Sequence, residues 1–139
     1  MKLFITLIFS AAFILSFYSC VRQKNCGEDF KVFIEKFKKD SIFQKQHIEF
    51  PLDEYYSDED FPLDIMERSI DEEHFTFIDF ENELPIELRN KNLYDIHINQ
   101  GNDTIFYQMF GKNNSIDVTY TFKCDQKTYK LVKIEDLTD

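Results

Sequence analysis

Glycine is scarce in this chain, with three residues, Gly27, Gly101 and Gly111, in a length of 139. Loops that cradle phosphate need several glycines at close spacing, and the nucleophile elbow of many hydrolases needs the pattern G-x-S-x-G. Neither pattern occurs in the sequence. The scarcity of glycine therefore excludes a glycine-rich phosphate site and a serine nucleophile of this kind.

Basic side chains are in deficit, because 16 Lys and Arg residues face 26 Asp and Glu residues and the formal net charge is −10. An acidic surface repels a phosphate backbone, so we expect no nucleic-acid partner. The hydrophobic content of 43% excludes a disordered tail, and the length allows one domain.

Metal-ligand patterns are missing as well. The histidines, His47, His74 and His97, lie far apart, and neither H-E-x-x-H nor C-x-x-C occurs. The acidic run 53–60 lacks the central glycine of an EF-hand loop, so we interpret it as solvated. The sequence predicts no bound metal and no cofactor.

Apolar residues are concentrated at the N-terminus. Lys2 is followed by residues 3–19, which contain no charge, Gly or Pro. A positively charged start and a run slightly shorter than a membrane span are typical of a secretory signal peptide. We predict a signal peptide over residues 1–19, with an uncleaved N-terminal anchor as the alternative.

The apolar run ends at Ser19-Cys20, and a small residue followed by Cys resembles the lipobox of bacterial lipoproteins. The resemblance implies that Cys20 is lipidated and becomes the mature N-terminus. Residues 20–27 are then the lipidated Cys and a tether, and residues 28–139 form a single domain.

The residues after Cys20 indicate which membrane would hold the lipoprotein and which side of it the domain would face. Val21 is not Asp, which in lipoproteins that resemble this one favours the outer membrane. Arg22 and Lys24 do not resemble the acidic export tag of surface-displayed lipoproteins. We therefore expect an outer-membrane lipoprotein whose domain faces the periplasm.

The cysteine count of three is odd for an exported protein. With Cys20 lipidated, Cys26 and Cys124 remain, and an exported compartment permits a disulfide between them. Two buried, unpaired thiols are the alternative.

The segment after the tether has helical periodicity. Capping-box spacings at 25–28 and 41–44 predict two helix starts, the second helix reaching about His47 with Phe43 against it. Within residues 29–40, one helix face carries four apolar side chains: Phe30, Phe33, Ile34 and Phe37.

The middle of the chain alternates between polar and apolar stretches. We predict a loop over residues 54–60, a short helix over 64–72, a strand over 74–81 and a short helix within 84–92.

The C-terminal third alternates with period two, which predicts strands over residues 94–100, 104–110, 115–124 and 128–136. One face of the first carries Tyr94, Ile96 and Ile98. In the third, the predicted buried face is Ile116, Val118, Tyr120, Phe122 and Cys124, and the predicted wet face is Asp117, Thr119, Thr121 and Lys123. The result is an antiparallel meander with one buried face.

Helices followed by a long curved antiparallel sheet predict the α+β class, with the helices packed on the sheet. The stretches FIEKFKKDSIFQKQHIEFPLD (33–53) and VTYTFKCDQKTYKLVKIED (118–136) resemble an uncharacterised lipoprotein family from Gram-negative gut anaerobes. Those proteins look like members of the nuclear transport factor 2-like superfamily, a cone-shaped α+β fold. The resemblance covers roughly residues 28–138 and implies no activity.

The sequence is compatible with two non-catalytic functions, ligand binding and partner binding. A cone lined by aromatic side chains suits an apolar small ligand, and the candidates for such a lining are Phe33, Phe37, Tyr94, Tyr107, Tyr120 and Phe122. Residues 129–134 place apolar side chains on both faces of the last strand, which favours a homodimer or an envelope protein partner.

An enzyme is the alternative that the superfamily resemblance implies, because some relatives are isomerases, dehydratases or hydrolases. They use a carboxylate or His inside the cone as base, with Tyr or a protonated acid stabilising the oxyanion. Asp79, His47 and Tyr120 are the catalytic candidates here. Since Asp95, His97 and Asp117 are expected to point away from the core, we favour a lipid-anchored module without catalysis.

Overall fold

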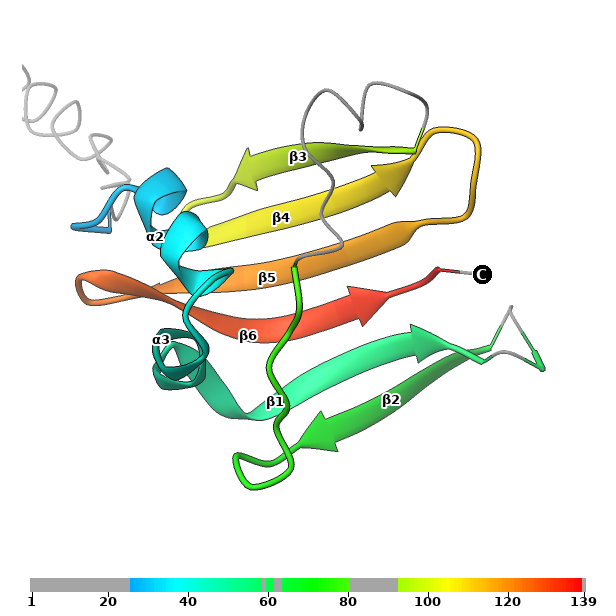
Figure 1. Cartoon of the computed structure of the whole chain (residues 1–139), viewed down its shortest axis with the longest axis horizontal. Coiled ribbons are helices and arrows are strands. Elements are labelled where there is room, and N and C mark those ends of the chain that lie inside the picture. Colours follow the sequence, from blue (N-terminus) through cyan, green and yellow to red (C-terminus); the bar gives the residue numbers. More distant parts are fainter. Residues whose placement is uncertain (1–25, 59, 62–63, 81–92, 139) are drawn as a thin grey trace, which may run out of the picture.

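The computed structural model describes residues 26–58, 60–61, 64–80 and 93–138. It has two short helices on one face of a curved six-stranded sheet (Figure 1). The elements are α2 (Phe30–Phe37), α3 (Ser41–Gln46), β1 (Ile48–Ser57), β2 (Ile65–Ile70), β3 (Tyr94–Gln100), β4 (Thr104–Gly111), β5 (Asp117–Asp125) and β6 (Thr128–Asp136). The predicted signal peptide, Cys20 and the predicted helix within 84–92 lie outside the described residues.

The sheet is mixed, which corrects the antiparallel prediction. Its strand order is β2-β1-β6-β5-β4-β3, and every neighbouring pair is antiparallel except β1 and β6, which run parallel. A parallel pair needs a long connection, and the chain between β1 and β6 includes the rest of the sheet. The α+β class is nevertheless the one observed.

Both predicted helices form, but each begins at a different cap. The Asp29 side chain accepts from the Lys31 N–H at 2.7 Å, so the 25–28 spacing does not start α2. Asp40 accepts from the Ile42 and Phe43 N–H groups at 3.1 and 2.9 Å and caps α3 in place of Ser41. A carboxylate at the N-cap satisfies N–H groups that have no partner inside the helix.

The predicted loop at 54–60 and the predicted helix at 64–72 are both wrong over most of their length. Residues 52–57 pair with residues 65–70 as a two-stranded edge of the sheet. The paired residues Leu52 and Ile70 pack in or against the core, while the charged residues beyond them lie at a solvated edge. Acidic side chains therefore do not exclude a strand at an edge.

The strand predicted over 74–81 is also wrong. Residues 74–80 contain no regular strand, although Phe75, Ile78 and Phe80 pack against the core. The apolar content of this segment reflects contact with the core and not pairing with a neighbouring strand.

The four C-terminal strands are confirmed, with one correction to their exposure. Phe122 is fully buried on the face predicted to be buried. Thr119 and Thr121 are also buried, although they were predicted to be wet. Each lies in a central strand between longer cross-strand neighbours, Gln108 and Glu135 for Thr119, and Phe106 and Lys133 for Thr121.

A register shift explains the apolar pattern of the last strand. Thr121 pairs with Lys133, but Phe122 pairs with Leu131, so Val132 is an extra residue in β6. The bulge allows Leu131 and Ile134 both to be buried against the core. The pattern that favoured a second packed surface therefore has an explanation within the domain, and a homodimer stays a prediction.

A disulfide joins Cys26, just before α2, to Cys124 near the end of β5, with a Cα–Cα distance of 5.5 Å. This is the first of the two alternatives for these cysteines. The bond ties the start of the domain to the end of β5, a strand in the interior of the sheet.

Candidate binding site

Residues 74–80 run across the helix-bearing side of the sheet (Figure 1). The Gln44 side chain binds the backbone of this segment at Ile78. Gln44 is fully buried in α3. Its amide nitrogen donates to the Ile78 and Phe37 carbonyls, each at 3.1 Å, and its amide oxygen accepts from the Ile78 N–H at 2.7 Å. Gln44 thus binds the Ile78 backbone as a neighbouring strand would.

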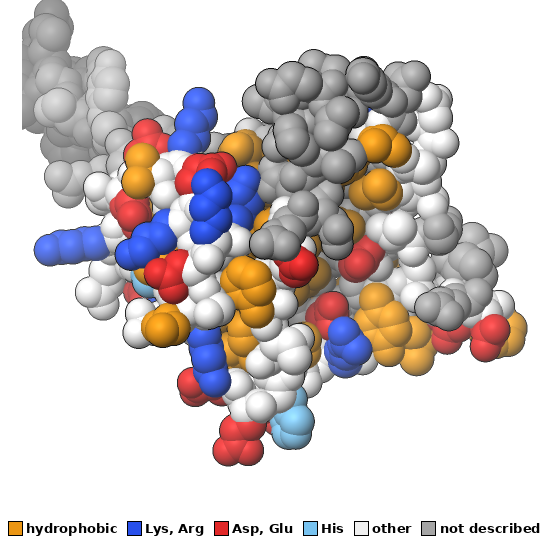
Figure 2. All heavy atoms as spheres, in the orientation of Figure 1, with side chains coloured by type: hydrophobic (Ala, Val, Ile, Leu, Met, Phe, Trp, Pro, Cys, Tyr) orange, Lys and Arg blue, Asp and Glu red, His pale blue; other side chains and the backbone are white. Residues whose placement is uncertain are grey.

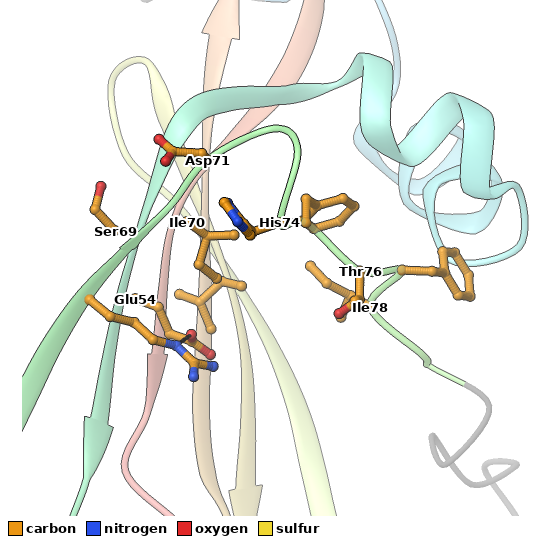
Figure 3. Close-up of a pocket in the computed structure, with 11 residues that line it drawn as sticks. Glu54, Ser69, Ile70, Asp71, His74, Thr76 and Ile78 are labelled. Carbon is orange, nitrogen blue, oxygen red and sulfur yellow. Dashed lines mark hydrogen bonds and ion pairs between the residues drawn. The ribbon is translucent and has the colours of Figure 1, made fainter.

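A pocket of about 420 Å³ lies between this segment and the β1–β2 edge (Figure 3). Ile70 of β2 lies on one side, Thr76 and Ile78 lie on the other, and Ile134 of β6 adds to the apolar wall. Polar groups also line it, and they include Glu54.

An ion pair forms the polar wall of this pocket. Glu54 of β1 and Arg68 of β2 are direct cross-strand partners, and the Arg68 Nε donates to a Glu54 carboxylate oxygen. The carboxylate hydrogen bond raises the pKa of Arg68 above its already high ordinary value, so the guanidinium stays charged. Glu54 is mostly buried, whereas Arg68 is 58% exposed and also lies over the Tyr56 ring at 5.2 Å. The cation is therefore the half of the pair that a ligand can reach.

A second pocket, of about 440 Å³, lies on the other side of the same segment. It is lined by residues of α3 together with Glu72, Phe75 and Phe77. Lys45 lies 3.7 Å from Glu72 at its rim. Phe75 and Phe77 line both pockets, so they form an apolar ridge between them, which we call the Phe75–Phe77 ridge.

The first pocket does not assemble a nucleophile and its base. The Ser69 hydroxyl donates to Asp53 at 3.4 Å, and Ser69 points away from His74 (Figure 3). Within the described residues, no group of three or more His, Cys, Asp or Glu side chains is placed to hold a metal. In the same part of the chain, no helix is long and apolar enough to cross a membrane. The geometry suits reversible binding of a ligand with apolar and charged parts.

The six predicted lining residues belong to the core. Five of them are buried, namely Phe33, Phe37, Tyr94, Tyr107 and Phe122, and Tyr120 is half-buried. Tyr94 is buried in the core, and the rings of the other five pack in pairs, with centroid distances of 5.6 Å for Phe33–Phe37, 5.3 Å for Phe37–Phe122 and 6.3 Å for Tyr107–Tyr120. None of the six lines either pocket beside the ridge.

The three catalytic candidates lie in different surroundings. His47 stacks on Phe43 at 3.9 Å, as predicted, and its Nδ1 lies 2.8 Å from the Phe43 carbonyl oxygen. Tyr120 packs against Phe80 at 5.1 Å. Asp79 is exposed, and none of the three lines either pocket beside the ridge.

Sequence reasoning missed Gln44, the Glu54–Arg68 pair and the ridge. A glutamine in a short helix normally faces water, so nothing local identifies Gln44 as buried. The ion pair follows only once the β1–β2 register is known. Phe75 and Phe77 carried a local signal, but their alternation was attributed to a strand.

A family model described as "Domain of unknown function (DUF4348)" matches residues 8–136. The chain belongs to this family. The predicted resemblance to an uncharacterised family is therefore confirmed for this DUF4348 chain. No curated protein is significantly similar to it in sequence.

Solved structures show the fold of the DUF4348 chain. An NTF2-like protein from Bacteroides fragilis has 22% identity and a TM-score of 0.57, over 84% of this chain and 50% of that chain. A cystatin-like protein from Bacteroides caccae has 21% identity and a TM-score of 0.56, over 80% of this chain and 77% of that chain. This chain thus spans half the length of the first protein. At such identities the likeness supports the nuclear transport factor 2-like α+β fold and nothing about activity.

Proposed function

We propose that this protein is a lipid-anchored envelope protein whose domain binds a ligand or partner at the Phe75–Phe77 ridge, without catalysing a reaction. One observation carries the binding part of the proposal. The aromatic side chains expected to line a cavity are packed in the core, while two open pockets share the ridge between them.

The chemistry of the two pockets suggests the ligand class. The ridge offers two Phe side chains, and Phe77 is 40% exposed. An exposed cation, Arg68, lies on one side, and the Lys45–Glu72 pair lies on the other. An extended peptide with an apolar central side chain and polar flanks matches this order of apolar and charged groups.

The ridge is tested by titrating the protein with tripeptides that have a central Leu or Phe, following methyl NMR signals. We expect saturable shifts at Ile70 and Ile78, which line the first pocket. Phe77→Ala removes apolar contact and is expected to weaken binding about tenfold. Phe110→Ala is the matched control, because Phe110 is similarly exposed, at 37%, but lies in β4.

Two results would contradict this binding site. One is the absence of shifts at Ile70 and Ile78 with every peptide. The other is equal weakening by the Phe77 and Phe110 substitutions, which would place binding elsewhere.

The lipid anchor rests on Ser19-Cys20 after the apolar run, and on the Cys26–Cys124 bond, which leaves Cys20 as the remaining cysteine. Cys20→Ser is expected to abolish attachment of the lipid and, with it, retention of the mature chain in the membrane. Metabolic labelling with a fatty acid, followed by membrane fractionation, measures both. Cys26→Ser is the control, since it removes the disulfide and leaves labelling intact. Undiminished label in the Cys20 variant would disprove the anchor.

A further inference from the structure

The start of the described chain lies against the turn between β5 and β6. The Cys26–Cys124 disulfide joins the two segments, and the Thr128 hydroxyl donates to the Glu28 carboxylate at 2.9 Å. A Cβ atom placed on Gly27 would lie 3.4 Å from the Lys127 carbonyl oxygen, so the two backbones run close together. These contacts fix the point at which the tether leaves the domain.

That point lies at one end of the sheet, and the β1–β2 turn lies at the other (Figure 1). β6 begins beside the exit point and runs parallel to β1, so β1 ends at the far end. Nine residues of strand, at about 3.3 Å per residue, separate the two ends by roughly 30 Å. We call residues 26–39 and 123–130 the tether end.

Charge is distributed unevenly between these two regions. Residues 26–39 and 123–130, the tether end, hold seven Lys residues and four Asp and Glu residues. Residues 53–80, which form the β1–β2 edge and the segment after it, hold one Arg and eleven acidic residues. A chain with a large negative charge thus has a locally basic end, and Lys and Arg side chains gather over α2 in Figure 2.

The lysines of the tether end differ in exposure. The Lys38 side chain is 12% exposed and lies 3.0 Å from Glu35, which also binds Lys39 at 2.9 Å. Lys31, Lys123 and Lys127 are exposed. Asp29 caps α2, Glu28 accepts from Thr128, and Asp125 lies 3.4 Å from Lys130. The exposed positive charge is therefore concentrated around the exit of the tether.

We propose that the tether end is a membrane-facing surface that binds the anionic phospholipid head groups of the membrane holding the anchor. The inference rests on the proposed lipid anchor at Cys20. Six residue steps separate Cys20 from Cys26, so the tether spans at most about 20 Å. A tether of this length keeps the lysines close to the surface, where an anionic membrane attracts juxtamembrane basic residues. The acidic β1–β2 edge is repelled by the same surface and faces away from it.

Hydrogen–deuterium exchange of the lipidated protein in nanodiscs tests the orientation. The discs contain phosphatidylcholine alone or phosphatidylcholine mixed with phosphatidylglycerol. We expect amides of residues 123–130 to exchange more slowly in the anionic discs, and those of residues 64–70 to be unchanged. High salt is expected to abolish the difference. Equal exchange in the two kinds of disc, or protection confined to residues 64–70, would overturn the proposal.

Charge reversal supplies the matched variants. Lys127→Glu changes the tether end, whereas Lys112→Glu changes a lysine in the β4–β5 turn, at the opposite end of the sheet, where it pairs with Asp95 at 2.8 Å. Flotation of the non-lipidated chain with phosphatidylglycerol vesicles measures the lipid contact without any acyl chain. We expect Lys127→Glu to weaken this binding about fivefold or more and Lys112→Glu to have little effect.

The two proposals fail in different ways. If the protein does not enter the nanodiscs, the anchor is absent. If it still floats with anionic vesicles and Lys127→Glu weakens that binding, the lipid-binding surface is retained. A protein that enters the discs, yet binds vesicles equally with either substitution, retains the anchor and lacks this surface.

Discussion

Gln44 shows how much one buried side chain contributes to the candidate site. It makes three hydrogen bonds to the backbone of Phe37 and Ile78. Gln44→Leu keeps the volume but leaves buried backbone groups without partners, which costs about 1–3 kcal/mol for each group. We therefore expect the free energy of unfolding in urea to fall by about 3 kcal/mol.

Gln46 provides the control for this prediction, because it lies in the same helix and is exposed. Gln46→Leu is expected to change the unfolding free energy by less than about 0.5 kcal/mol. Equal effects of the two substitutions would show that Gln44 does not hold residues 74–80.

Tyr129 is expected to make the free energy of unfolding depend on pH in the alkaline range. Burial, together with the nearby Asp29 and Glu28 carboxylates, raises the pKa of Tyr129 in the folded state. The unfolded chain therefore releases this proton first, near the ordinary pKa of about 10. The stability that the neutral phenol contributes is present below that pH and is lost as the pH rises towards the folded pKa.

Urea unfolding between about pH 9 and pH 11 measures this effect. We expect the wild-type stability to fall more steeply with pH than that of Tyr129→Phe, which has no phenol proton at this position. Tyr56→Phe is the control and is expected to follow the wild type. Parallel curves for all three proteins would exclude Tyr129 as a source of the pH dependence.

At the scale of the element, α2 is attached to the sheet by one face. Phe33 is fully buried, with ring centroids of Phe37, Phe122 and Tyr129 at 5.6, 5.8 and 5.4 Å. Phe33→Ala is expected to lower the unfolding free energy by about 3–5 kcal/mol, through lost burial and the cavity left behind. Chemical denaturation measures the loss.

Val32 is the neighbouring control, because it is 65% exposed on the other side of the same helix. Val32→Ala is expected to alter stability by less than about 0.5 kcal/mol. Should Phe33→Ala fail to fold, Phe33→Leu is expected to show a smaller loss of the same sign. A negligible loss with Phe33→Leu and with Phe33→Ala would contradict the packing.

The elements differ in how far they could be predicted. The α2 face and the four C-terminal strands alternate strongly between apolar and polar residues, and burial of one face enforces that alternation. Residues 64–72 lack such a pattern, because β2 is an edge strand with five of its six residues exposed. Its strand conformation depends on pairing with β1, which is a tertiary contact.

At the scale of the whole molecule, the Cys26–Cys124 disulfide joins residues 98 positions apart and closes a loop that contains β1 to β4 and most of β5. In the chain-entropy model, a loop of about this length contributes about 4–5 kcal/mol by constraining the unfolded chain. We expect a reductant, or the double substitution Cys26→Ser and Cys124→Ser, to lower the unfolding free energy by up to this amount. An unchanged urea midpoint under reducing conditions would contradict the prediction.

The sequence by itself determined the acidic charge, the apolar N-terminal run, the α2 core face and the C-terminal strands. These features depend on composition or on contacts between residues close in the chain, so they can be read locally. Only the tertiary structure decided the β1–β2 edge, the parallel β1–β6 pair, the burial of Gln44 and the two pockets beside the ridge. Each of these depends on contacts between segments far apart in sequence, whose energy exceeds the local preferences of the residues involved.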